Sequence, residues 1–124
     1  MEGGTIEQTL PGLGSGAVPT AATVGRAIGL TPNKRLTLVS GRSNPELANR
    51  IADHLDCELG RVTLKTFANG ETYCRYEESI RGADMFIVQT ASIPVDQHLM
   101  ELLIMINAAK LASAKRITAV IPWF

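Results

Sequence analysis

The sequence contains few cysteines, and this limits the kinds of site that the protein can have. Its 124 residues include two, Cys57 and Cys74, which stand seventeen positions apart. This number and spacing exclude a disulfide scaffold and a zinc site built from Cys-x-x-Cys pairs. Reduced thiols are typical of the cytoplasm, so we expect a cytoplasmic protein.

Long apolar runs and an excess of charge of either sign are also missing. The longest uninterrupted apolar run covers residues 102–106, far fewer than a membrane span needs. The sequence shows no basic start followed by an apolar stretch, so a secretory signal is not expected. Twelve Lys and Arg balance twelve Asp and Glu, which gives no attraction to polyanions. We therefore expect neither nucleic acid nor a membrane as a partner.

The first 33 residues have little charge and no aromatic side chain. They hold seven of the eleven glycines, three of the six prolines and only three charged residues. Such a segment buries too little apolar surface to offset the entropy lost on ordering. We predict a flexible Gly/Pro/Thr-rich tail over residues 1–33 and a folded domain over residues 34–124. The glycines of residues 12–16 lack a preceding strand, which favours a loose linker over a phosphate-binding loop.

A regular pattern begins at Leu36. Residues 36–40 are typical of a short strand, and apolar residues recur at helical spacing over residues 45–55. Ser43 is followed three residues later by Glu46, which is the spacing of a capping box, and Pro45 suits the first turn of a helix. We therefore predict a helix that is capped by Ser43.

The middle of the chain predicts a hairpin, a buried strand and a long helix. Alternating runs at 61–67 and 71–77 flank Asn69-Gly70, a pair that favours a hairpin turn. Residues 85–88 form a short apolar run, as expected of a strand buried on both faces. Residues 95–112 have helical character and are apolar around most of the circumference, which predicts burial on several sides, in the core or at a subunit contact.

The order of these elements predicts an α/β fold with a largely parallel sheet. Ligands of such sheets bind beyond the carboxyl ends of the strands, so we expect functional loops after Val39, Val88 and the last strand. The closing segment, residues 117–124, is apolar and β-prone. A central parallel strand is normally followed by a loop and a covering helix. We therefore expect an incomplete domain, truncated after a central strand; an edge strand that ends a small domain is the alternative.

Five ordered segments and a closing one resemble ribose-phosphate pyrophosphokinase (phosphoribosyl pyrophosphate synthetase). They cover residues 43–48, 67–71, 77–82, 100–106, 112–118 and 119–122. The resemblance implies a fold like the type I phosphoribosyltransferases and a homo-oligomer. It also implies transfer of the diphosphate of ATP to ribose 5-phosphate, with Mg²⁺ as the metal, in the synthesis of nucleotides. An unrelated α/β nucleotide-binding module would explain the architecture but not the shared segments.

The resemblance implies that Phe67, Asn69 and Glu71 hold the adenine and ribose of ATP across a subunit contact. Many family members have Asp at the position of Asn69. From the residues alone, a hairpin tip without a ligand is the favoured interpretation. The resemblance also implies that Ser79 and Arg81 bind a regulatory phosphate or ADP at a subunit junction, for which a solvated turn is the alternative.

The resemblance places the catalytic and metal-binding segments of the family after the position of Phe124. We therefore assign no catalytic residue and no metal ligand to this sequence, and we expect the isolated chain to be inactive. The alternative function is that of a non-catalytic regulatory or binding relative, which associates with intact synthetase subunits. The presence of Phe67 and Glu71 favours descent from an active enzyme.

Overall fold

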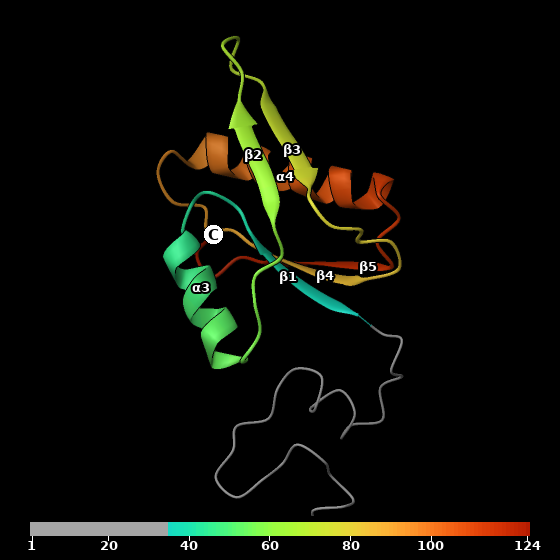
Figure 1. Ribbon diagram of the computed structural model, residues 1–124. Coiled ribbons are helices and arrows are strands. Elements are labelled where there is room, and N and C mark those ends of the chain that lie inside the picture. The colour runs from blue at the N-terminus through green and yellow to red at the C-terminus, as the bar shows by residue number, and fades with distance from the viewer. Residues whose placement is uncertain (1–34) are drawn as a thin grey trace, which may run out of the picture.

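The computed structural model describes residues 35–124, and the tail predicted over residues 1–33 lies outside the described residues. The elements follow one another in the predicted order (Figure 1). They are β1 (Leu36–Ser40), α3 (Pro45–His54), β2 (Val62–Thr66), β3 (Thr72–Tyr76), β4 (Asp84–Val88), α4 (Val95–Leu111) and β5 (Arg116–Val120).

Three strands form a parallel sheet in the order β1-β4-β5, and β2 and β3 form a separate antiparallel pair. The predicted α/β fold with a mainly parallel sheet is therefore confirmed. β5 is an outer strand of the described sheet and is only half-buried. Its expected place as a central strand of a larger sheet stays a prediction.

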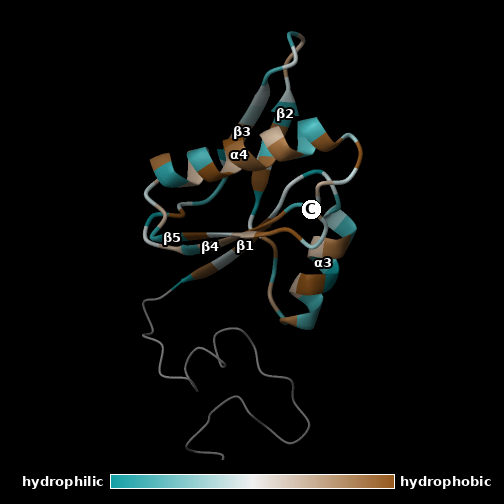
Figure 2. Ribbon diagram, turned by 180° about the vertical axis from the view of Figure 1, so that it is seen from behind, coloured by the Kyte–Doolittle hydropathy of each residue, from teal (hydrophilic) through white to brown (hydrophobic). Residues whose placement is uncertain are grey.

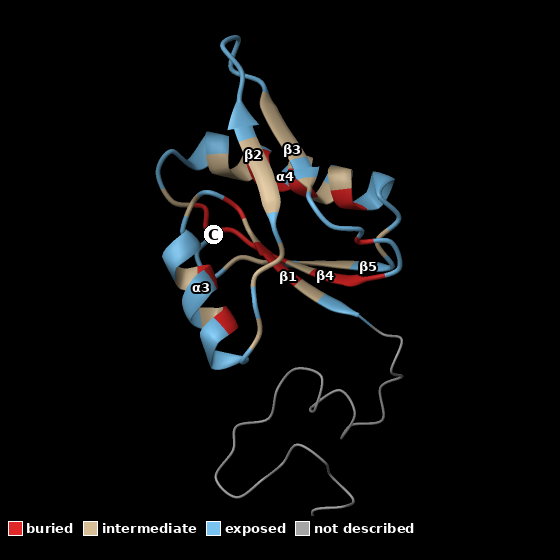
Figure 3. Ribbon diagram, in the orientation of Figure 1, coloured by how far each residue is buried: buried red, intermediate tan, exposed pale blue. Residues whose placement is uncertain are grey.

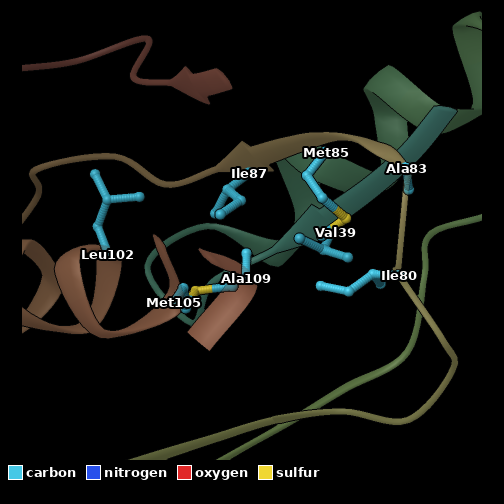
Figure 4. Packing of buried hydrophobic residues seen from close by; sticks show 8 residues of the cluster. All are labelled: Val39, Ile80, Ala83, Met85, Ile87, Leu102, Met105 and Ala109. Atoms are coloured by element: carbon cyan, nitrogen blue, oxygen red, sulfur yellow. The ribbon is translucent and has the colours of Figure 1, made fainter. Parts of the chain in front are cut away.

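Two cores lie on the two faces of this sheet. On one face, Val39, Met85 and Ile87 pack against α4 (Figure 4). On the other face, Leu38 and Val88 pack against α3. Successive strand residues point to opposite faces, so β4, which is covered on both sides, is the most deeply buried strand (Figure 3). The predicted burial of this strand is confirmed.

The start of α3 differs from the prediction. Asn44 is the N-cap, and its Oδ1 accepts a hydrogen bond from the Leu47 N–H at 3.0 Å. Pro45 occupies the first turn as predicted. The predicted capping by Ser43 is wrong, because its hydroxyl donates to Gln89 Oε1 at 2.6 Å and accepts a bond from the Thr90 N–H at 2.8 Å.

The described chain buries one face of α4. Its buried side chains lie along one face, whereas Met100 and Leu103 are 55% and 58% exposed. Apolar segments recur along α4 (Figure 2), and these two apolar side chains lie outside the core. No described element covers this second face, so its predicted burial in the core is wrong, and its burial at a subunit contact stays a prediction. Neither of the two described helices is long and apolar enough to cross a membrane.

Candidate functional site

The hairpin formed by β2 and β3 projects from the body of the domain (Figure 1). Its tip comprises residues 67–71, where the Phe67 N–H donates to Glu71 O at 2.8 Å and the Gly70 N–H donates to Phe67 O at 2.9 Å. Gly70 has a φ of +92°, a conformation that glycine adopts without steric cost. The predicted hairpin is confirmed, with a glycine-containing loop longer than a two-residue turn.

The tip gathers the three side chains that the sequence singles out. Phe67 is 48% exposed, and its ring is tilted by 56° against Tyr73, with the ring centroids 5.7 Å apart. Asn69 Oδ1 accepts a hydrogen bond from the Glu71 N–H at 3.1 Å, which fixes the turn. Glu71 is exposed. An aromatic face, an amide and a carboxylate are thus presented within five residues, and together they can stack on a base and bind hydroxyl or amino groups.

A buried polar cluster lies at the carboxyl ends of β1 and β4. Glu101 of α4 is 2% exposed. Its carboxylate accepts hydrogen bonds from Arg42 N at 2.7 Å, from Arg42 Nε at 2.5 Å and from Gln89 Nε2 at 3.0 Å. Gln89 is 1% exposed, and its Oε1 accepts bonds from the backbone N–H and the hydroxyl of Ser43. The loops after β1 and β4 meet in this cluster of Arg42, Ser43, Gln89 and Glu101. That these loops are functional stays a prediction.

A groove of 500 Å³ separates the outer half of the hairpin from the first turns of α4. Arg42, Thr66 and Gly70 line one part of it, and Asp96 and His98 line another. Its volume is that of a small-molecule site. Arg42 joins the buried cluster to the hairpin, because its Nη2 donates to Thr66 Oγ1 at 3.0 Å while its side chain remains 42% exposed.

Ser79 and Arg81 lie beyond β3, at the end of the hairpin opposite to the tip. Both residues are exposed. The Arg35 guanidinium donates to the carbonyl oxygens of Ser79 at 2.5 Å and of Arg81 at 3.3 Å. The structure therefore does not bring these two residues together with Phe67, Asn69 and Glu71.

Arg42, Gln89 and Glu101 are not among the residues that sequence patterns single out. One signal was present: Glu101 is the one charged residue of the apolar stretch 99–106, and a buried carboxylate needs partners. Arg42 and Gln89 carry no local signal, because their partners lie 59 and 12 positions away. Within residues 35–124, no group of three or more His, Cys, Asp or Glu is placed to hold a metal ion.

Comparison with known proteins assigns the chain to a protein family. The model of the N-terminal domain of ribose phosphate pyrophosphokinase matches residues 36–124. The chain belongs to the ribose-phosphate pyrophosphokinase family.

Curated relatives of this family are similar to the chain over its folded part. The chloroplastic ribose-phosphate pyrophosphokinase 2 of Spinacia oleracea is 56% identical over 92 residues, which are 74% of this chain and 23% of the relative. The ribose-phosphate pyrophosphokinase of Nostoc sp. is 50% identical over 98 residues, which are 79% of this chain and 30% of the relative. The chain thus spans about a quarter of the length of these pyrophosphokinases.

Solved structures confirm the expected type I phosphoribosyltransferase-like fold. The phosphoribosylpyrophosphate synthetase of Mycobacterium smegmatis superposes with a TM-score of 0.70 at 50% identity, over 72% of this chain and 30% of that enzyme. The hypoxanthine-guanine phosphoribosyltransferase of L. donovani gives a TM-score of 0.51 at 14% identity, over 81% of this chain and 59% of the transferase. The second match shows the fold alone.

Proposed function

We propose that this chain is the nucleotide-facing, N-terminal part of a ribose-phosphate diphosphokinase. That enzyme transfers the diphosphate of ATP to ribose 5-phosphate and forms phosphoribosyl pyrophosphate for nucleotide synthesis. The observation that supports this proposal is the family match over residues 36–124. We infer that the enzyme acts in the cytoplasm as a homo-oligomer.

In this proposal the hairpin tip binds ATP. Phe67 stacks on the adenine, because its half-exposed ring is held by Tyr73 in a fixed tilt. The Asn69 side chain shapes the turn through its oxygen and can donate from its amide nitrogen. The Glu71 carboxylate accepts hydrogen bonds from the ribose hydroxyls or the adenine amino group. The projection of the tip from the domain suits a contact made across two subunits.

Ser79 and Arg81 are proposed to bind a regulatory phosphate. A hydroxyl and a guanidinium both suit phosphate oxygens. Arg35 supports the assignment, because its guanidinium lies against the carbonyls of both residues and adds a second positive charge. This phosphate would lie at the base of the hairpin, away from the ATP at the tip.

Diphosphate transfer spreads negative charge over the transferred group, so it needs cations near that group. Mg²⁺ supplies this stabilisation when it is bound. Residues 35–124 contain no group of three or more His, Cys, Asp or Glu that could hold this ion. The role left to these residues is to bind and orient the nucleotide, and we expect no diphosphokinase activity from the chain alone.

A chimaeric enzyme tests the proposal. Residues 36–124 replace the matching segment of the Mycobacterium smegmatis synthetase, to which they are 50% identical. We expect the chimaera to form phosphoribosyl pyrophosphate from ATP, ribose 5-phosphate and Mg²⁺, while the isolated chain forms none. A chimaera that folds, as judged by circular dichroism, but does not bind ATP would contradict the proposal, and so would an active isolated chain.

A further inference from the structure

We propose that Arg42 is a positioning residue that fixes the outer half of the hairpin against the domain. It acts through Thr66, which immediately precedes Phe67, and so sets where the tip stands relative to the groove. The inference rests on the proposed function only for the identity of the ligand at the tip.

The hairpin is well anchored at its base. Val62, Leu64 and Cys74 pack against the core under α4, and the Tyr76 hydroxyl donates to Met105 O at 2.8 Å. These contacts leave the far end of β2 unsupported, because Lys65 and Thr66 are exposed. A two-stranded ribbon without cover on its outer half is only marginally rigid.

One side-chain hydrogen bond of the described residues ties this outer half to the rest of the domain. It runs from Arg42 Nη2 to Thr66 Oγ1, with a length of 3.0 Å. The tip itself is stabilised by bonds within the hairpin, such as that from the Glu71 N–H to Asn69 Oδ1. Internal bonds fix the shape of the tip but not its place over the groove, so placement depends on Arg42.

Arg42 can serve as a fixed point because its own position is determined by a buried carboxylate. Its backbone N–H and its Nε both bond to Glu101, which is further held by Gln89. The guanidinium is planar and rigid, so an Nε held by Glu101 also directs Nη2 toward Thr66. The ammonium group of a lysine lacks this fork. One side chain thereby links three parts of the fold, which are the loop after β1, the helix α4 and the end of β2.

Residual dipolar couplings of the full 124-residue chain test this role, because they report how one part of a molecule is oriented and how mobile it is relative to another. In the unchanged chain, amide couplings from β2 and β3 should fit the same alignment as those from β1, β4 and β5. Thr66→Val removes the hydroxyl at nearly constant volume, and we expect the β2 and β3 couplings to shrink while those of the sheet persist. Thr66→Ser restores a hydroxyl and should restore the couplings.

Thr63→Val is the matched control. The Thr63 hydroxyl bonds to Glu77 inside the hairpin, so this variant loses a threonine hydroxyl from the same strand without touching Arg42. Unchanged β2 and β3 couplings in Thr66→Val would overturn the proposal, and so would an equal reduction of these couplings in Thr63→Val. Arg42→Lys should behave as Thr66→Val does, and the Thr66 variants decide the matter if Arg42→Lys fails to fold. The couplings are measured without nucleotide, so a chimaeric enzyme that binds no ATP would contradict the proposed function and leave the role of Arg42 standing.

Discussion

Gly41 lies where the structure leaves no room for a side chain, and Gly41→Ala is therefore a severe test of the buried cluster. A Cβ at this position would stand 2.1 Å from Gln89 Oε1 and 2.4 Å from Gln89 Cδ. Real Cβ atoms do not approach other atoms so closely. Gln89 is 1% exposed and cannot swing into solvent. Alanine at position 41 therefore displaces the Gln89 amide from its partners.

The loss of stability in Gly41→Ala follows from the hydrogen bonds that the Gln89 amide makes. Gln89 Oε1 accepts two bonds from Ser43, and Gln89 Nε2 donates to His98 O and to Glu101. At about 1 kcal/mol for each buried bond, losing two to four of them costs about 2–4 kcal/mol. For a domain of this size we expect the melting temperature to fall by about 8–32 °C.

A double-mutant cycle followed by thermal unfolding measures whether Gln89 is the cause. Gln89→Ala removes the atoms that the new methyl group would meet. In that background, Gly41→Ala should change the free energy of unfolding by less than about 0.5 kcal/mol, because its destabilising contact is gone. An equal loss of stability in both backgrounds would refute the account of the cluster.

Three further predictions concern the surface of α4, a buried thiol and the hairpin tip. Leu103, which is 58% exposed, lies on the uncovered face of α4, so Leu103→Glu should raise the monomer fraction in sedimentation; an unchanged fraction would show that this face does not self-associate. Burial raises the pKa of Cys74 from 9.0 to about 11, so the contribution of this thiol to stability is complete below pH 9 and is lost as the pH rises through 11. Cys74→Ala should therefore reduce the fall in the free energy of unfolding between pH 9 and 11. An identical pH profile in the variant would contradict this role of Cys74. Asn69→Asp keeps the oxygen that bonds to the Glu71 N–H, so its melting temperature should stay within a few degrees of that of the unchanged chain, whereas Asn69→Ala should lower it by several degrees.

Local sequence patterns predict most of the fold. The alternating runs around Asn69-Gly70 are sufficient for the hairpin, because a turn and its flanking strands are neighbours in sequence. The apolar run at residues 85–88 is likewise sufficient for a strand that packs on both faces. Each of these features depends on residues that are close together in the chain.

Local sequence patterns do not predict the polar cluster, because its hydrogen-bond partners come from segments that are distant in the sequence. Ser43 has the spacing of a capping residue, yet its hydroxyl bonds to Gln89 and Thr90, 46 and 47 positions away. Asn44 then provides the cap. A side chain with two possible partners takes the one that the tertiary fold buries with it, and spacing alone does not reveal that choice.

The exposed face of α4 has a similar cause. Composition predicts burial on several sides of the helix, in the core or at a subunit contact, and within a single layer the helix covers its sheet with one face. Met100 and Leu103 therefore point away from the core of the described chain. A subunit contact that covers them stays a prediction.

If the hairpin tip binds ATP as proposed, the KM for ATP of the chimaeric enzyme depends on Phe67. Stacking of a base on an aromatic side chain contributes about 1–3 kcal/mol, so Phe67→Ala should raise this KM by about 5- to 150-fold. The KM for ribose 5-phosphate should stay constant, and Leu111→Ala, at an exposed position at the far end of α4, should change neither value. A KM for ATP that is the same with Phe67 and with alanine would contradict the account.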